Sequence, residues 1–334
     1  MDLQSIDIKA IAKQRSGVLI LFATLALFLI TNALLRDNES LNFIPILIAA
    51  LVVVEIFLLV GMEVKQGANE HGWKHEVVDT VVALLVAVAI WYGASFVLNT
   101  SSPVSGVVSC SMLPNLQRGD FIIVQGTQPH AYDISMTKEE LAALNSRAEI
   151  IYGNGKNASI EGSIFSFCRL QSNDLCSEFV KSPDSILERI GPFTYRYTKC
   201  PMSFSNGEEG YQPCLKSVEF KGREYLTNFS NDIVVYQPPK TDLYSMVGDI
   251  VHRAMFRIDV DGRKYYLTRG DNNPILDIQA YDYSGGLANH PVPQEQLRGK
   301  VIMRVPILGY FKLFIMGYLQ EDPQCKTQLA FPHV

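Results

Sequence analysis

The sequence IVHRAMFRIDVDGRKYYLTR, residues 250–269, predicts two neighbouring strands joined by a tight turn. Residues 250–260 and 264–268 are rich in β-branched and aromatic side chains, which favour strands. Asp261-Gly262 lies between them, and this dipeptide suits a type I′ turn because that turn needs positive φ at both central residues. The stretch therefore predicts a β-hairpin.

The hairpin also predicts a contact between an imidazole and a carboxylate. A two-residue loop pairs Val260 with Arg263, and the same register places His252 opposite Asp271. Directly opposed residues share a face of the sheet, with Cβ atoms about 4.5–5.5 Å apart. A β-bulge would shift the register by one residue and remove this pairing.

Further strand candidates lie on both sides of the hairpin, at residues 121–124, 233–236 and 301–305. They are short, rich in β-branched or aromatic residues, and bounded by Gly, Asp or Pro. No long amphipathic helical repeat runs through this part of the chain. We therefore expect residues 101–319 to form a mostly β domain with antiparallel strands.

Residues 127–228 differ in character from the strands around them. Thr137 is followed three residues later by Glu140, which predicts a capped helix over residues 137–144. The remainder is polar and contains glycine and clustered cysteines. We interpret it as an insertion between two strands that is stapled by disulfides because it has little core of its own. Substrate contact, partner contact and cover for a sheet edge all remain open as its role.

Four of the six cysteines lie within this insertion, namely Cys168, Cys176, Cys200 and Cys214. Their spacing lacks a C-x-x-C pair, so neither zinc nor another metal is expected. Two disulfides are expected instead, with three possible connectivities.

Three apolar runs precede the β region, over residues 17–35, 43–62 and 77–98. Each is close to the roughly 20 residues that a helix needs to cross about 30 Å of hydrocarbon. The first run exceeds the usual 7–15 apolar residues of a signal peptide, and no small-residue cleavage site follows it. We expect residues 1–100 to form a membrane anchor with three transmembrane α-helices, the alternative being buried core helices.

The charges in the short loops predict the orientation of this anchor. Three basic residues precede the first run and two lie between the second and third, whereas Arg36 alone lies between the first and second. The amino terminus is therefore expected in the cytoplasm and the β domain outside it. The formal net charge of -5 gives no basic footprint for nucleic acid.

Ser111 and His252 are the residues that suggest chemistry. A serine hydroxyl is a weak nucleophile until a base removes its proton, and imidazole suits this task because its unperturbed pKa lies near neutrality. A carboxylate behind the imidazole would fix its tautomer. The backbone N–H of Ser111 and the hydroxyl of Ser109 are candidate donors to an oxyanion. Each residue alone is more often an ordinary loop or strand residue, so only the joint pattern supports catalysis.

Residues 109–114 (SCSMLP), the Gly119-Asp120 strand start, residues 248–253 (GDIVHR) and residues 267–273 (LTRGDNN) together resemble type I signal peptidases. His252-Arg253, where the bacterial branch carries a lysine, resembles the archaeal and endoplasmic-reticulum branch. Residues 299–301 and 305–310 are similar to that branch's closing segment. The resemblance covers residues 104–124 and 231–311, in the expected order.

This resemblance implies a signal-peptidase-like antiparallel β fold in which Ser111 is the nucleophile and His252 the general base. It implies that Asp271 and Asp277 both matter. The family usually assigns the later aspartate as third member, so Asp277 is the favoured partner of His252, whereas the hairpin register favours Asp271. Near the nucleophile, the oxyanion and substrate-binding candidates are Ser109, Met112 and Pro114.

The implied reaction is endoproteolytic removal of amino-terminal signal peptides, cut after small residues at -1 and -3, without a cofactor. Secretory preproteins and the lipid bilayer are the implied partners, and the protein-translocation channel is a further candidate. The extended peptide would bind as an added strand. One alternative is a catalytically silent, membrane-anchored β domain that binds exported proteins. Another is a processing peptidase dedicated to a narrow set of surface proteins.

The chain departs from the family pattern at three residues near these motifs. Cys110 stands where the family has glycine, Arg269 where lysine is common, and Asn115 where threonine is common. We expect the small side chain of Cys110 to point away from the site. The insertion and two additional amino-terminal spans are also unusual and leave the substrate range open.

The apolar stretch at residues 305–319 is too short and too charged to span a membrane. It suits either a membrane-surface segment or a buried strand and turn. Residues 320–334 are expected to form a tail.

Overall fold

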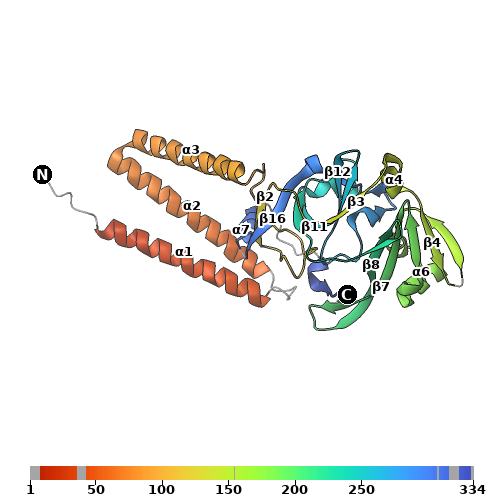
Figure 1. The fold of residues 1–334 in the computed structure, drawn as a ribbon. Helices are drawn as coiled ribbons and strands as arrows, with labels where there is room; N and C mark the ends of the chain where they lie inside the picture. The colour runs from red at the N-terminus through yellow and green to blue at the C-terminus, as the bar shows by residue number, and fades with distance from the viewer. Residues whose placement is uncertain (1–7, 36–42, 154, 307, 316–322, 332–334) are drawn as a thin grey trace. The chain divides into compact units, whose positions relative to one another are not determined.

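The computed structural model describes residues 8–35, 43–153, 155–306, 308–315 and 323–331 (Figure 1). The chain divides into two compact units, Met1–Gly93 and Ala94–Val334. The first unit is helical and the second contains all of the β-sheet.

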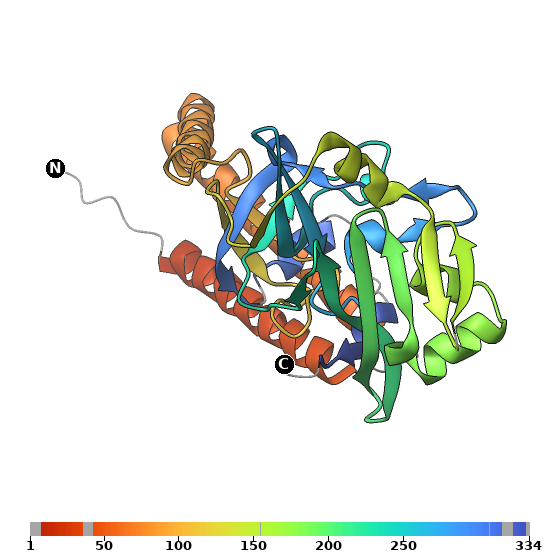
Figure 2. The same cartoon turned by 45° about the vertical axis from the view of Figure 1, so that its right-hand side comes forward.

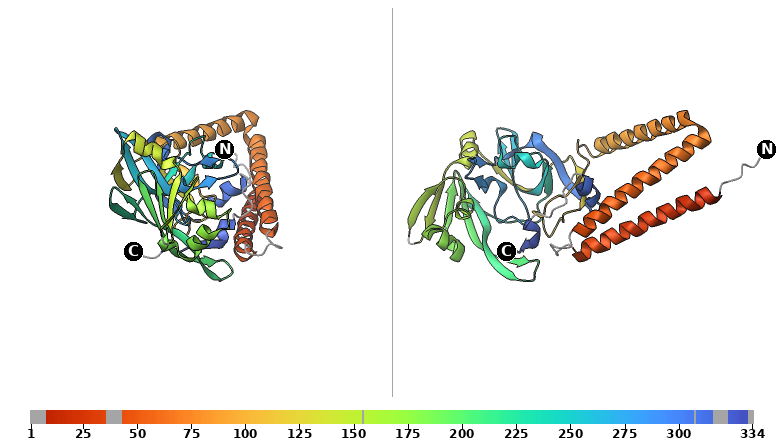
Figure 3. Two further views of the ribbon diagram at one scale, coloured as in Figure 1. Left: turned by 90° about the vertical axis from the view of Figure 1, so that its right-hand side faces the viewer. Right: turned by 180° about the vertical axis from the view of Figure 1, so that it is seen from behind.

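The amino-terminal unit consists of long helices at the three apolar runs, drawn in red to orange in Figure 3. Their bounds are α1 Ile8–Leu35, α2 Phe43–His71 and α3 Trp73–Val97. Thr24 of α1 donates a hydrogen bond of 2.5 Å to Glu55 of α2, which gives the carboxylate in this apolar helix a polar partner.

Of the three membrane spans expected from the sequence, one is supported within the described residues. The helix α3 has 25 residues and is long and apolar enough to cross a membrane. The described apolar part of α1 is shorter, Ser16–Phe28, and falls below the roughly 20 residues that a span needs. The expectation of three spans is therefore corrected to one candidate, α3.

The first sheet of the second unit contains the predicted hairpin, β11 and β12, near one end of its strand order. Its main strand order is β1-β2-β16-β10-β11-β12-β15, and the neighbours in this order are antiparallel. The strand β3 runs parallel to the second half of β11, beyond the point where β10 ends. The strand bounds are β1 Val104–Gly106, β2 Phe121–Gln125, β3 Tyr132–Ser135, β10 Ile233–Tyr236, β11 Ile250–Val260, β12 Arg263–Arg269, β15 Val292–Pro293 and β16 Leu297–Val305.

The hairpin has the predicted turn, but its register changes along the strands. Val260 pairs with Arg263 as expected, and Asp261 and Gly262 both have positive φ, 51° and 83°. A bulge between Ala254 and Phe256 then shifts the register by one residue. The predicted position of His252 opposite Asp271 is therefore wrong, because the inserted residue displaces every pair beyond the bulge.

Strands of the insertion form most of a second, seven-stranded sheet in the order β5-β4-β6-β7-β8-β9, and β17 from the end of the chain completes it beside β7. Its helix α4, Lys138–Ala142, begins with the predicted capping box of Thr137 and Glu140. The expectation of little core is wrong: one large apolar cluster joins this sheet to the face of β11 and β12. The strand bounds are β4 Ala148–Tyr152, β5 Lys156–Ile160, β6 Leu187–Ile190, β7 Phe193–Phe204, β8 Glu209–Phe220, β9 Arg223–Leu226 and β17 Thr327–Leu329.

Shorter elements connect the two sheets and close the chain. The helices are α5 Ile164–Cys168, α6 Asp174–Lys181 and α7 Tyr310–Ile315. The helix α7 replaces the strand and turn considered for residues 305–319, of which residues 307 and 316–319 lie outside the described part. The 3₁₀ turns and remaining strands are η1 Ala143–Asn145, η2 Pro183–Ser185, η3 Leu243–Val247, η4 Asp277–Gln279, η5 Gln294–Gln296, η6 Pro323–Lys326, β13 Tyr281–Asp282 and β14 Leu287–Ala288.

All six cysteines form disulfides, and free cysteines are absent from the described residues. Within the insertion the bonds are Cys168–Cys176 and Cys200–Cys214, one of the three connectivities that the sequence allowed. A third bond was not expected and joins Cys110 to Cys325 across 215 residues. Disulfides are typical of an oxidising, extracytoplasmic compartment.

The described part of the predicted tail is ordered by the second sheet. Thr327, Gln328 and Leu329 pair with the end of β7 (Figure 2). Residues 323–331 therefore do not form the separate tail that was expected from residue 320, because their backbone completes an existing sheet.

Candidate active site

Ser111 lies in the loop between β1 and β2, two short strands that pair with each other. Its side chain is buried and its carbonyl oxygen accepts a hydrogen bond of 2.7 Å from the backbone N–H of Asn272. A segment more than one hundred and fifty residues downstream therefore fixes the backbone of this loop.

His252 projects from β11, where it pairs with Val234 of β10. Its Nε2 atom lies 3.0 Å from the hydroxyl of Ser111. Its Nδ1 atom lies 2.6 Å from Oδ2 of Asp277. These two contacts arrange a hydroxyl, an imidazole and a carboxylate in one continuous hydrogen-bonded chain.

Asp277 begins the 3₁₀ turn η4 and receives more than one hydrogen bond. Its Oδ2 atom also accepts from the hydroxyls of Thr268, at 2.6 Å, and Tyr236, at 3.1 Å. Burial raises the pKa of Tyr236 well above its ordinary value, so this hydroxyl stays protonated as a donor. Within the described residues, Oδ1 of Asp277 has no hydrogen-bond partner.

Asp271 does not contact His252 and instead binds Arg253. The guanidinium of Arg253 donates from Nε and Nη2 to the two carboxylate oxygens, at 2.7 and 2.6 Å. Asn115 donates a further hydrogen bond of 2.7 Å to Oδ2. A bidentate Arg–carboxylate pair is a strong and directional contact. Asp271 therefore anchors the strand that carries His252 and the loop that follows Ser111.

The other three residues expected near the nucleophile occupy different environments. The hydroxyl of Ser109 lies 3.1 Å from that of Ser111, so it stands beside the reacting atom. Met112 is buried in an apolar cluster with Val107 and Leu116. Pro114 is exposed on the surface. Of these three, Ser109 is thus the residue with a direct polar contact to Ser111.

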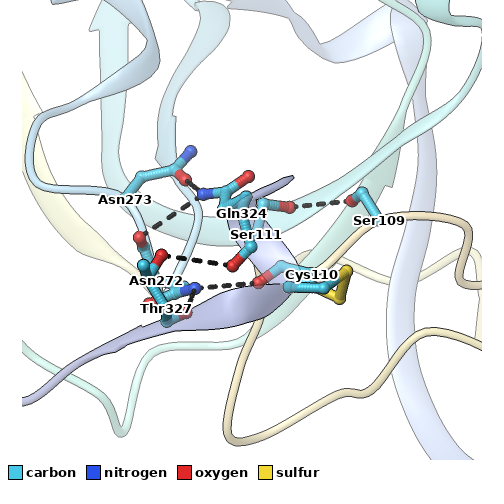
Figure 4. Close-up of a disulfide and its surroundings, with 8 residues drawn as sticks. Ser109, Cys110, Ser111, Asn272, Asn273, Gln324 and Thr327 are labelled. Carbon is cyan, nitrogen blue, oxygen red and sulfur yellow. Dashed lines mark hydrogen bonds between the residues drawn. A yellow bond between two sulfur atoms is a disulfide. The ribbon is translucent and has the colours of Figure 1, made fainter. Parts of the chain in front are cut away.

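The sequence did not predict that Thr268 and Tyr236 donate hydrogen bonds to Asp277. It also did not predict that Asn272 contacts the nucleophile loop. Asn272 is 3 % exposed and its side chain donates to the carbonyl oxygens of Cys110, at 3.2 Å, and Thr327, at 2.8 Å. Asn272 lies inside the 267–273 motif, but an asparagine at such a position is equally typical of a turn. The bond from Cys110 to Cys325 also shows where the unusual cysteine points, away from the hydroxyl of Ser111 (Figure 4).

Arg269 is a further buried charged residue near the site, at 1 % exposure. Its Nη1 atom donates to Thr227 at 3.1 Å, and its guanidinium lies 4.3 Å from the ring centroid of Phe331. Burial lowers its pKa to about 10. The aromatic face supplies a favourable contact for a cation that has left water.

The geometry supports one kind of chemistry. With the Nδ1 proton of His252 donated to Asp277, Nε2 is the nitrogen that can accept the proton of Ser111. The hydroxyl would then attack an electrophilic carbon such as a carbonyl. Within the described residues, no group of three or more His, Cys, Asp or Glu side chains could hold a metal ion.

Comparison of the sequence with models of known protein families and with curated proteins gives no match. The arrangement of the site therefore has to be interpreted from its own residues.

Proposed function

We propose that the chain is a membrane-anchored serine endopeptidase that removes amino-terminal signal peptides from exported preproteins. The observation that carries this proposal is the hydrogen-bonded chain from Ser111 through His252 to Asp277. Three residues from distant parts of the sequence meet within hydrogen-bond distance and in the order that acyl transfer needs.

Each residue has a distinct role in the proposed reaction. His252 takes the proton of Ser111 as the hydroxyl attacks the scissile carbonyl, and then gives that proton to the leaving amine. Asp277 orients the imidazole and stabilises the imidazolium. The hydroxyl of Ser109 and the backbone N–H of Ser111 are the proposed donors to the oxyanion. Water completes the cycle by hydrolysing the acyl-enzyme.

The position of β1 supports an extended peptide as substrate. This strand is at one end of the sheet order and leads into the Ser111 loop. A peptide added beside an edge strand forms main-chain hydrogen bonds and presents alternate side chains to the protein. We propose that the cleavage site carries small residues at -1 and -3.

The long apolar helix α3 and the disulfides support a location at the outer face of a membrane. We propose that α3 is the membrane anchor, that the amino terminus is cytoplasmic, and that the translocation channel delivers the substrate. Signal peptides are themselves apolar, so an enzyme held at the bilayer meets them where they emerge.

The proposal is tested with the purified full-length chain in detergent or lipid vesicles and a preprotein that carries a cleavable signal peptide. We expect Ser111→Ala to lower kcat at least about 10⁴-fold, because no other group supplies the nucleophile. Ser284→Ala, at an exposed serine in the β13–β14 turn, is the matched control and should leave kcat unchanged. Full turnover by Ser111→Ala would refute the proposal.

The second sheet favours one narrower candidate. A folded insertion of this size suits the selection of substrates, so the enzyme would process a small set of surface proteins. A panel of general secretory precursors and surface-protein precursors separates the two possibilities by kcat/KM. A folded protein that binds the precursors but cleaves none of them would instead be the silent binding domain.

A further inference from the structure

The residues 323–331, which we call the carboxy-terminal strap, run from the nucleophile loop to the second sheet. The strap begins with the 3₁₀ turn η6, which contains Cys325, and continues into β17. Cys325 is bonded to Cys110, the residue directly before Ser111 (Figure 4). Cys110 is 1 % exposed, so the bond lies inside the protein.

Asn272 connects the strap to the same loop through its amide. Its side-chain NH₂ donates to the carbonyl oxygens of Cys110 and Thr327, at 3.2 and 2.8 Å. Its side-chain oxygen accepts from the backbone N–H of Leu329 at 2.7 Å. Its own backbone N–H donates to the carbonyl oxygen of Ser111 at 2.7 Å. Asn272 thus binds Cys110 and the strap through its side chain, and Ser111 through its backbone N–H.

The far end of the strap is held by the second sheet and by an aromatic contact. β17 pairs with the end of β7, and Leu329 packs against Cys200 and Cys214. The ring of Phe331 covers the guanidinium of Arg269 at 4.3 Å. The strap is therefore joined to the nucleophile loop at one end and to the second sheet at the other.

We propose that the strap is a positioning element of the active site, in which the Cys110–Cys325 disulfide and Asn272 together set the placement of the Ser111 hydroxyl relative to His252. This proposal rests on the peptidase function proposed above. The backbone of Ser111 is held on one side by the disulfide of Cys110 and on the other by the N–H of Asn272. A displacement of about 1 Å at a reacting group costs about 10² in rate.

Reduction of the disulfide would release the first of these two contacts. A dithiol such as dithiothreitol transfers two electrons and two protons to the Cys110–Cys325 bond and becomes a cyclic disulfide. The products on the protein are two separate thiols. Turnover is therefore expected to fall on reduction and to return on reoxidation.

The main test compares two double variants of the full-length protein. Cys110→Ala with Cys325→Ala removes the strap disulfide, and Cys168→Ala with Cys176→Ala removes a disulfide of the insertion as a control. We expect kcat per folded molecule to fall about 10²-fold in the first variant, with KM unchanged. The control variant should keep both constants. Equal kcat in the two variants would overturn the proposal.

Asn272→Ala provides the second test and remains informative if the first double variant fails to fold. It keeps the disulfide but removes the amide contacts, so kcat should again fall while KM stays constant. Asn206→Ala, at an exposed asparagine in the β7–β8 turn, is the matched control. An Asn272→Ala variant with wild-type kcat would remove Asn272 from the proposed positioning element.

Amide hydrogen exchange separates failure of this proposal from failure of the proposed function. We expect the amides of Asn272 and Leu329 to exchange faster after reduction, because their acceptors are Ser111 and Asn272. This readout needs no catalysis. Faster exchange in a protein that cleaves no preprotein would leave the strap supported and the peptidase refuted. Unchanged exchange and kcat on complete reduction of Cys110–Cys325 would refute the strap alone.

Discussion

Gly270 shows how closely two segments approach at the nucleophile. A Cβ atom at this position would lie 2.6 Å from the carbonyl oxygen of Ser111 and 2.7 Å from the side-chain nitrogen of Asn273. Both distances are far below an ordinary van der Waals contact. The absence of a side chain at Gly270 therefore allows the 270–273 loop to reach the backbone of Ser111.

Gly270→Ala tests this close approach. The added methyl group must displace either Ser111 or its own loop, so we expect a fall in kcat of about 10²-fold and a loss of about 1–3 kcal/mol in unfolding free energy. Gly93→Ala is the control, because a Cβ atom there meets nothing within 4 Å. Kinetics and urea unfolding of both variants measure the effects, and wild-type values for Gly270→Ala would contradict the steric interpretation.

Individual residue contacts were predictable only where local geometry determines them. The Asp261-Gly262 turn follows from backbone preferences within two residues. The partner of His252 depends on a bulge at the middle of β11, which the pattern of apolar residues does not reveal. The hairpin register consequently favoured Asp271, whereas the structure places Asp277 beside the imidazole and Arg253 beside Asp271.

At the scale of elements, Glu188 links the second sheet to the turn that carries Asp277. It lies on β6, is fully buried, and accepts hydrogen bonds from Tyr197 and from the backbone N–H of Ile164. Gln279 of the turn η4 also donates to it at 3.1 Å. Burial raises the pKa of Glu188 to about 7 from its ordinary 4.5.

This shift predicts how stability depends on pH. The folded state binds the Glu188 proton more tightly than the unfolded state, so the stabilisation is complete below pH 4.5 and is lost as pH rises through about 7. The shift corresponds to roughly 3 kcal/mol in unfolding free energy. Glu188→Gln cannot titrate and should flatten this part of the profile, as measured by urea unfolding between pH 4.5 and 8.

Glu149→Gln serves as the control for this prediction, because Glu149 is exposed on the neighbouring strand β4. We expect it to keep the wild-type profile. An unchanged pH profile in Glu188→Gln would show that this buried carboxyl is not responsible for the dependence.

Most strands of the first sheet were predictable, whereas the core of the insertion was not. Residues 233–236 and 250–260 have continuous apolar and β-branched patterns, and the structure forms strands with the same bounds. The insertion buries its apolar residues, such as Ile150 and Phe193, against Phe256 of the other sheet. Such a shared core depends on contacts between distant segments. For the same reason, the sequence did not predict the bond between Cys110 and Cys325.

At the scale of the whole molecule, the chain has two compact units. We propose membrane anchoring for the first unit and catalysis for the second. The helical unit contains long apolar segments, and the β unit contains the disulfides and the candidate site. The basic residues in the short loops are the basis for the proposed orientation, with the site outside the cytoplasm.

Single-cysteine labelling tests this orientation in sealed vesicles. We expect Ser284→Cys, in the β unit, to react with a membrane-impermeant maleimide only from the outer side. Asn69→Cys, near the end of α2, should react only from the cytoplasmic side. Both residues are exposed, and all native cysteines are in disulfides. The reverse labelling pattern would contradict the proposed orientation, and detergent should make both sites reactive.

The long separation between Cys110 and Cys325 has a consequence for biogenesis. During synthesis, Cys110 leaves the ribosome 215 residues ahead of its partner Cys325, and Ser111 directly follows Cys110. The serine loop therefore stays unbraced while the intervening polypeptide is still being translated. On the function proposed above, a half-made molecule would cleave slowly, and full hydrolysis would begin only after the downstream segment has arrived and been oxidised.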